Sequence, residues 1–379
     1  MALPTKMGLG FRLLRLAWLG VVCLIAFRSR AQLADQFGAS ALVVGFTNIT
    51  GSNTLATAEA GEPNHAGEPA SRSVWVRWTP AVTGTYSIST SNSTTPTGQR
   101  MDTLLAVYTG TTLSNLTPVV SNDDLEPFVV WSEVVFRAYA GETFHIAVDG
   151  FGAVGAGNIK LQIGRGGPLM GPWSAVDLEG RPIVSGDFSN QVLLVDFWET
   201  TCATCVQELP DLVQLYQAYR PRGFNFIGLS SDPDPELVLE YFTHNPRPPY
   251  IIGMASLSSS NSLGGPSGFP TKYLVDQEKR IVARYQGAVP TTTTPLQYYS
   301  NAVALLMRPA PEIRLGAARD AGGVKLSWPL SGAAFKVEAS DDPGSGWGEI
   351  SVSVQTNSDS ITATLPVDRP KRFFRLRGP

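Results

Sequence analysis

The chain has few of the residues that build metal centres and disulfide scaffolds. Among its 379 residues are three cysteines and three histidines. His65, His145 and His244 are scattered, and no second pair of zinc ligands accompanies Cys202 and Cys205. Secreted proteins that rely on structural disulfides usually carry several cysteine pairs that link distant segments. We therefore expect neither a zinc site nor a disulfide scaffold.

The sequence also lacks an apolar run of comfortable membrane-spanning length. The apolar core at Leu13–Phe27 is interrupted by Arg15 and falls short of the roughly 20 residues that a spanning helix needs. Basic residues precede it, and Ser29-Arg-Ala31 offers the small residues of a signal-cleavage site. Residues 1–31 are interpreted as a secretory signal peptide. An uncleaved segment, which would attach the protein to a membrane, is the alternative.

No run of basic residues stands out, and the charge balance is mildly acidic. The formal net charge is −3, and residues 1–31 carry five Lys or Arg and no acid, so the remaining chain has a net charge of −8. Basic patches are the usual footprint of nucleic-acid binding. We expect no nucleic-acid partner.

What the sequence does contain is an apolar stretch that runs into a cysteine pair. Val192–Trp198 is apolar except for Asp196, which is typical of a central strand covered on both faces. Cys202–Tyr219 has helical spacing, so Cys202 is expected at a helix N-terminus, where free N–H groups and the helix dipole favour a thiolate. Cys205 lies one turn further, close enough to attack a mixed disulfide at the first sulfur. The alternative, a structural disulfide, closes too small a loop to stabilise the fold much.

This segment resembles the active site of thioredoxins, and residues from about Pro172 to Met307 share the resemblance. The run Cys205-Val-Gln-Glu-Leu-Pro210 is similar to the membrane-anchored and periplasmic thioredoxin-like reductases of the TlpA/ResA type. Residues 172–308 are therefore expected to form a thioredoxin-like α/β domain with a mixed sheet. Four motifs stand in the family's order: Asp196-Phe-Trp, Cys202-Ala-Thr-Cys205, Gly268-Phe-Pro270-Thr and Lys272–Val282.

Two positions depart from the family's pattern. Thr201 stands before the first cysteine, where tryptophan is common, and Ala203-Thr204 separates the cysteines in place of a pair that contains proline. Both positions tune the redox potential in this family. Whether the pair acts as reductant or oxidant is therefore left open.

The resemblance implies thiol–disulfide exchange without a cofactor. Cys202 attacks a partner disulfide as a thiolate and Cys205 resolves the mixed disulfide. Asp196 is the candidate proton relay for Cys205, because a buried carboxyl has a raised pKa and accepts a proton near neutral pH. The alternative is a strand aspartate whose partner is a neighbouring backbone or hydroxyl group. Glu208 is interpreted as a solvated residue of the first helix, although the family tends to carry it.

The resemblance also assigns the candidate substrate-binding residues Phe269, Pro270 and Trp198. In the family, the loop at Pro270 has a cis peptide bond, lies against the cysteines and offers its backbone to the substrate; X–Pro is the one bond at which cis costs little. Phe269 is expected beside the sulfurs. Trp198 is also typical of an aromatic residue that packs beneath the active site.

Alternating runs separated by turn residues predict an all-β sandwich over residues 35–164. Their order resembles the pre-peptidase C-terminal type of secreted sandwich, an accessory or binding module. Aspartates in its loops either hold calcium through oxygen ligands or bond their own backbone. The aspartates are Asp102, Asp123, Asp124 and Asp149, and the runs are Ser73–Trp78, Gly84–Ser89, Leu104–Tyr108, Ser132–Arg137 and Phe144–Val148.

Residues 312–379 alternate again and look like a small fibronectin-III-like β module. Linkers at Arg165–Gly171 and Arg308–Pro311 separate the three parts. The expected fold class is therefore multidomain: an all-β sandwich, a thioredoxin-like α/β domain and a small all-β module.

Three functions compete. The leading hypothesis is an exported, periplasmic, cell-surface or secreted thiol-disulfide oxidoreductase, with protein thiols or disulfides and an unidentified thiol donor or acceptor as partners. A peroxidase of the same superfamily needs Thr three positions before its cysteine, where Glu199 stands. The third is a cell-surface or secreted binding protein in which the β modules carry the function and the middle domain is a scaffold.

The signal-peptide interpretation predicts a mature chain that begins near Gln32 and lies outside the cytoplasm. N-terminal sequencing of the protein from its native host measures this directly. A chain that still begins at Met1 and stays in the cytosol contradicts the prediction and removes the argument for an oxidising compartment.

Overall fold

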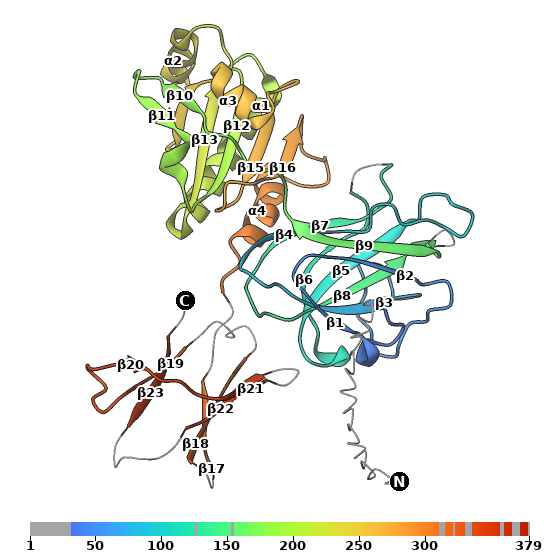
Figure 1. Cartoon of the computed structure of the whole chain (residues 1–379). Coiled ribbons are helices and arrows are strands. Elements are labelled where there is room, and N and C mark those ends of the chain that lie inside the picture. Colours follow the sequence, from blue (N-terminus) through green and yellow to red (C-terminus); the bar gives the residue numbers. More distant parts are fainter. Residues whose placement is uncertain are drawn as a thin grey trace, which may run out of the picture. The chain divides into compact units, whose positions relative to one another are not determined.

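A computed structural model of the chain describes residues 32–125, 128–152, 155–310, 315–320, 323–329, 336–356, 360–365 and 372–377 (Figure 1). The predicted signal peptide, residues 1–31, lies outside the described residues. None of the helices in the described part of the chain combines the length and apolar character that a membrane span requires.

Two β-sheets that share one apolar core form the N-terminal part (Figure 1). Each run predicted as a strand lies in one of them. Trp78 in the first sheet packs edge-on against Tyr86 in the second, with ring centroids 4.8 Å apart. The first sheet has the order β1 (Leu42–Val44), β3 (Val74–Thr79), β8 (Phe144–Gly150), β5 (Thr103–Thr109), β6 (Thr117–Asn122). The second has the order β2 (Thr47–Ser52), β9 (Asn158–Arg165), β4 (Gly84–Ser89), β7 (Glu133–Ala138).

One strand pair in these two sheets differs in direction from the others. All strand pairs are antiparallel except β1 with β3, which run parallel. Parallel neighbours need a crossover connection, and here the chain passes through β2 in the other sheet between the two strands. Two 3₁₀ helices lie in this part: η1 (Phe37–Ala39) and η2 (Leu113–Asn115).

The middle part is a seven-stranded mixed sheet with helices (Figure 1). β12 pairs parallel with β13, β13 pairs parallel with β14, and the remaining neighbours pair antiparallel. The strands are, in sheet order, β11 (Pro182–Val184), β10 (Ser174–Asp177), β14 (Ile251–Met254), β13 (Phe224–Ser230), β12 (Val192–Trp198), β15 (Thr271–Val275) and β16 (Ile281–Gln286). The helices are η4 (Ser185–Phe188), α1 (Ala203–Tyr219), η5 (Arg220–Arg222), α2 (Pro235–His244), α3 (Leu257–Leu263) and α4 (Pro295–Leu306).

The sheet has a separate apolar core on each face. Val192, Leu194 and Trp198 of β12 belong to the core that includes residues of α1 and α4. Leu193 and Val195 alternate with them and belong to the opposite core. Every residue of β12 is buried, which confirms the prediction of a central strand covered on both faces. The even-numbered residues, Asp196 among them, therefore point toward α1 and α4.

The described C-terminal residues form two small antiparallel sheets around one apolar cluster. Their likeness to fibronectin III stays a prediction. One sheet has the order β17 (Gly316–Asp320), β18 (Gly323–Pro329), β22 (Ser360–Leu365), β21 (Val354–Thr356). The other has the order β20 (Gly348–Glu349), β19 (Lys336–Ser340), β23 (Phe373–Arg377). The buried residues of the cluster are Leu326, Trp328, Val337, Ile361, Ala363 and Leu365.

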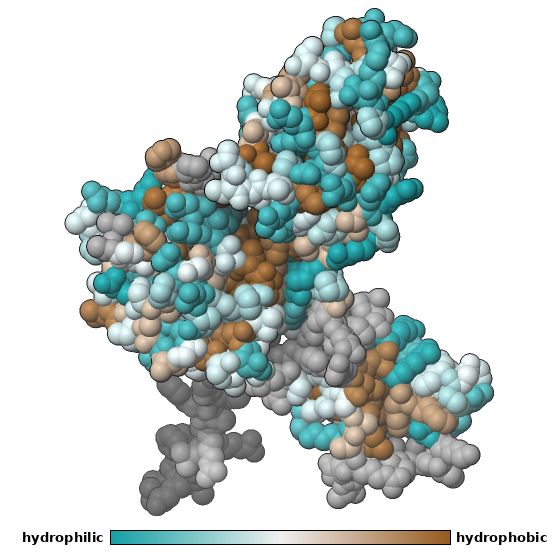
Figure 2. Space-filling view, turned by 180° about the vertical axis from the view of Figure 1, so that it is seen from behind, coloured by the Kyte–Doolittle hydropathy of each residue, from teal (hydrophilic) through white to brown (hydrophobic). Residues whose placement is uncertain are grey.

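Polar and apolar residues are mixed on the face of the molecule drawn in Figure 2. Some large apolar side chains are almost fully exposed, such as Leu55 at 93% and Phe128 at 94%. Scattered apolar residues of this kind are normal on protein surfaces. The informative residues of this chain are instead the charged ones inside it.

Candidate functional site

The cysteine pair lies at the junction of β12 and α1. Cys202 is the N-cap of the helix, and its Sγ accepts a hydrogen bond from the backbone N–H of Cys205 at 3.2 Å. The two residues form a disulfide with Cα atoms 5.3 Å apart. Cys205 is buried at 1% exposure, whereas Cys202 is only partly buried. Cys205 is therefore shielded from solvent, whereas Cys202 is partly accessible.

Hydrogen bonds hold the turn that precedes Cys202. Thr200 donates its backbone N–H and its hydroxyl to the carboxylate of Asp232, at 3.0 and 2.7 Å. Ser230, at the end of β13, donates to the same carboxylate at 2.6 Å. Sequence reasoning missed Asp232. The sequence feature that could have identified it is a polar residue just beyond the carboxyl end of a central strand. Such a residue lies at the sheet edge where β12 also ends.

The proline loop is placed at the same end of the sheet by the pairing of β12 with β15. Phe197 lies opposite Thr271, which immediately follows Pro270. The Phe269–Pro270 peptide bond is cis, which confirms that prediction. The carbonyl of Pro270 accepts a hydrogen bond from Gly287 N–H at 2.9 Å. Phe269 is partly buried and packs on both apolar cores. The role of this loop in substrate binding stays a prediction.

Trp198 lies inside the domain at 1% exposure. Its ring contacts two aromatic residues of α2, Tyr241 at 6.3 Å and Phe242 at 6.0 Å between centroids. This position agrees with the aromatic residue that packs beneath the active site. A direct contact with substrate would require these neighbours to move.

Asp196 lies in a buried cluster of charged side chains beneath the cysteine pair. Its Oδ1 forms an ion pair with Nζ of Lys272 at 3.3 Å, and Asp196 and Lys272 are directly opposite each other on β12 and β15. The same Nζ donates a hydrogen bond to Oε2 of Glu208 at 2.6 Å. Tyr299 of α4 donates its hydroxyl to that oxygen at 3.4 Å. All four residues are at most 3% exposed.

This cluster corrects two expectations. Glu208 is not a solvated residue of the helix: it is 3% exposed and points inward, because it lies one turn after Cys205 on the same helical face. Asp196 is not paired with a neighbouring backbone or hydroxyl group but with the ammonium of Lys272. Sequence reasoning missed Lys272, although a lysine inside a strand covered on both faces signals a buried partner.

Asp196 is more easily protonated than an exposed aspartate. Burial raises its pKa to about 6; the Lys272 ammonium opposes this rise, and the Glu208 carboxylate adds to it. Burial also raises the pKa of the Tyr250 and Tyr299 hydroxyls, so both stay neutral near neutral pH. Asp196 can therefore exchange a proton in the pH range where thiols react.

Three of the four aspartates predicted in the sandwich loops gather in one place. Carboxylate oxygens of Asp102, Asp123 and Asp124 all lie within 4.8 Å of one another. Burial and the two neighbouring carboxylates raise the pKa of Asp102 to about 6. Asp149 lies in β8 and not in a loop, and it accepts three backbone N–H groups at 2.7–2.8 Å, from Ser71, Arg72 and Gly150. Calcium binding by the first three stays a prediction.

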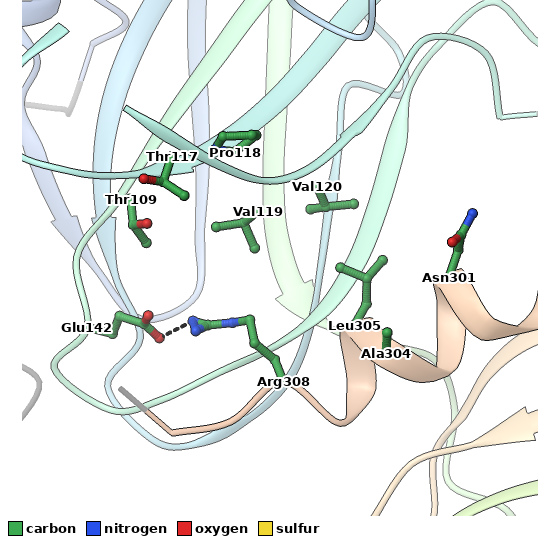
Figure 3. A pocket seen from close by; sticks show the side chains of 10 residues that line it. All are labelled: Thr109, Thr117, Pro118, Val119, Val120, Glu142, Asn301, Ala304, Leu305 and Arg308. Atoms are coloured by element: carbon green, nitrogen blue, oxygen red, sulfur yellow. Dashed lines mark ion pairs between the residues drawn. The ribbon is translucent and has the colours of Figure 1, made fainter. Parts of the chain in front are cut away.

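A pocket of about 730 Å³ lies between β6 and α4 (Figure 3). Arg308 and Glu142 form an ion pair at one end of it. The side chains that line it include no cysteine and none of the predicted site residues. They are Thr109, Thr117, Pro118, Val119, Val120, Glu142, Asn301, Ala304, Leu305 and Arg308.

Asp196→Asn is expected to raise the free energy of unfolding above about pH 6 and to change it little at about pH 4. Because burial raises the carboxyl pKa, the folded protein holds a proton that the unfolded chain has lost, so wild-type stability falls as the pH rises from about 4 to about 6. A carboxyl pKa that is about two units higher in the folded protein than in the unfolded chain lowers the free energy of unfolding by about 3 kcal/mol once both carboxyls are ionised. Urea denaturation of both oxidised proteins over this range measures the effect. Equal pH dependence in both would contradict it.

Comparisons with known proteins bear on the middle part of the chain. Residues 171–303 match the protein-family model described as Redoxin. The chain is 29% identical over 130 residues to thiol-disulfide oxidoreductase ResA of Bacillus cereus, which spans 34% of this chain and 72% of that protein. It is 25% identical over 128 residues to the ResA of Bacillus thuringiensis, with the same two coverages of 34% and 72%.

Solved structures resemble the same part. A thioredoxin-family thiol:disulfide interchange protein from Chlorobium tepidum is 23% identical and covers 38% of this chain and 98% of its own, with a TM-score of 0.34. A thiol:disulfide interchange protein from Bacteroides is 27% identical and covers 38% of this chain and 92% of its own, with a TM-score of 0.33. The resemblances of the two flanking β regions stay predictions. With the Redoxin match, the ResA relatives and the Cys202–Cys205 pair, the chain is a thiol-disulfide oxidoreductase whose middle domain has a thioredoxin-like fold.

Proposed function

We propose that this protein is exported and exchanges disulfides with the thiols of other proteins through Cys202 and Cys205. The observation that carries the proposal is the unequal burial of the two cysteines at the start of α1: Cys202 is partly exposed, and Cys205 is buried one helical turn before Glu208. Export is inferred from the basic and apolar segments of residues 1–31. An oxidising compartment suits a protein whose two remaining cysteines form one reactive pair.

The exchange begins at Cys202. Its thiolate attacks one sulfur of a partner disulfide; the partner's S–S bond breaks, and the partner's other sulfur leaves as a thiolate that takes a proton from water. The helix N-terminus stabilises the attacking thiolate. A mixed disulfide now joins Cys202 to the partner.

The second step closes the disulfide of the enzyme. Cys205 gives its thiol proton to the carboxylate of Asp196, and the resulting thiolate attacks Sγ of Cys202. The mixed disulfide breaks, and the partner's sulfur leaves as a thiolate that takes a proton from water. The partner is then a dithiol that has gained two electrons. Thiols of an external donor return the pair to its reduced form. The same steps in reverse oxidise a dithiol partner, and the reduction potential of the pair sets which direction dominates.

Changing either cysteine separates the two steps. In the mature chain, Cys202→Ser should abolish the reduction of insulin disulfides by dithiothreitol, because the attacking sulfur is gone. Cys205→Ser should accumulate mixed disulfides, visible on non-reducing gels, because the resolving sulfur is gone. Circular dichroism of both variants checks that they fold. Full activity in both variants would reject the proposal and favour the surface-binding alternative, in which the middle domain is a scaffold.

Asp196→Asn should slow resolution of the mixed disulfide more than its formation, because the amide keeps the shape of the side chain but accepts no proton. The loss of a general base costs about 10²–10⁴-fold, and we expect the lower end because water can substitute. Rapid-mixing measurements over a pH series give both rates. Identical resolution rates and pH profiles in the two proteins would show that Asp196 is only structural.

A further inference from the structure

Lys272 is a buried cation that the two exchange steps leave without a role. It lies in β15 at 0% exposure, opposite Asp196 on the neighbouring strand. An uncompensated lysine inside a protein loses its proton or destabilises the fold. Two carboxyl groups compensate it here, Glu208 from α1 and Asp196 from β12.

The two carboxyl groups are not equivalent partners. Nζ donates a hydrogen bond to Glu208 at 2.6 Å, whereas its ion pair with Asp196 is longer, at 3.3 Å. Tyr299 donates a second hydrogen bond to the same oxygen of Glu208. Glu208 is thus the more closely bound of the two partners of Lys272.

Charge balance leads to the same assignment. One ammonium and two carboxylates would leave a net negative charge in a region at most 3% exposed, and an unbalanced buried charge is expensive. The excess negative charge is relieved when one of the two carboxyl groups takes up a proton. Since Glu208 takes the shorter bond from Lys272 and the bond from Tyr299, Asp196 is the carboxyl that takes up a proton first.

We propose that Lys272 is a positioning residue that holds Glu208 through a short hydrogen bond and so reserves Asp196 to take and return the proton of Cys205. This inference rests on the proposed exchange reaction. It adds that two charges, those of Lys272 and Glu208, shift the pKa of the proton acceptor Asp196. Lys272 itself transfers no proton: its ammonium and the Glu208 carboxylate act on Asp196 with opposite signs.

Other titratable groups that face the cluster come from each element packed on it. Tyr299 projects from α4, Tyr250 precedes β14, and Tyr285 of β16 stacks edge-on with Tyr299 at 5.2 Å between ring centroids. Burial raises the pKa of all three hydroxyls, so they remain neutral near neutral pH. Cys205 of α1 is the thiol served by the relay. Among the described residues, the charges that act on Asp196 are therefore those of Lys272 and Glu208.

The two charges predict opposite pH shifts. Without the Lys272 ammonium, the proton on Asp196 is held more tightly; without the Glu208 carboxylate, it is held less tightly. Lys272→Met should therefore move the midpoint of the pH profile for mixed-disulfide resolution upward, and Glu208→Gln should move it downward. We expect about one pH unit in each direction, the low end for a charge in the same buried cluster. The double variant should lie between the two single variants.

The measurement is the rate of mixed-disulfide resolution in the mature chain from about pH 4 to about pH 9, followed by rapid mixing. Matched controls are Lys160→Met and Glu240→Gln, which change exposed residues and should leave the midpoint of the wild type unchanged. Lys272→Arg keeps the positive charge and should restore a midpoint near that of the wild type.

Midpoints equal to that of the wild type in both Lys272→Met and Glu208→Gln would overturn the inference. If Lys272→Met does not fold, Glu208→Gln and the double variant decide, and a Glu208→Gln midpoint at or above that of the wild type overturns it. Failure of the exchange reaction itself is distinguishable, because Cys202→Ser would then retain the activity of the wild type. Shifted midpoints with an inactive Cys202→Ser support both proposals.

Discussion

Burial of β12 on both faces is the constraint on which the site depends. The strand is covered by one apolar core that includes α1 and α4 and by another on the opposite face, so a charged side chain on it can reach no water. Asp196 therefore needs a partner supplied by the protein, and Lys272 of the adjacent strand provides it. The same strand leads into the N-terminus of α1. The packing of β12 thus sets both the pKa of the Asp196 carboxyl and the position of Cys202.

Much of the middle domain follows from local patterns. Val192–Trp198 is recognisable because apolar, β-branched and aromatic residues fill it, and β12 has these bounds. Asp234 before Pro235 marks a helix start, and its side chain caps Glu236 N–H at 3.0 Å. Such features depend on neighbours a few residues apart. They can therefore be predicted before the fold is known.

The charged cluster could not be predicted in this way. Lys272 and Glu208 are 64 positions apart, and their contact exists only because β15 pairs with β12 beneath α1. Periodicity places Glu208 on a helix but does not say which face of that helix is covered. The three sandwich aspartates show the same limit: their loops were visible in the sequence, whereas the approach of Asp102 to Asp123 and Asp124 follows from strand pairing.

The unequal burial of the two sulfurs has a consequence for timing. In the proposed exchange, a partner joins through Cys202, which is partly exposed, and it is released by Cys205, which is buried. The lifetime of the mixed disulfide is then set inside the enzyme, by the transfer of the buried Cys205 proton. Mixed disulfides with partner proteins of very different sequence would have nearly the same lifetime. The partners would differ mainly in the rate at which their mixed disulfides form.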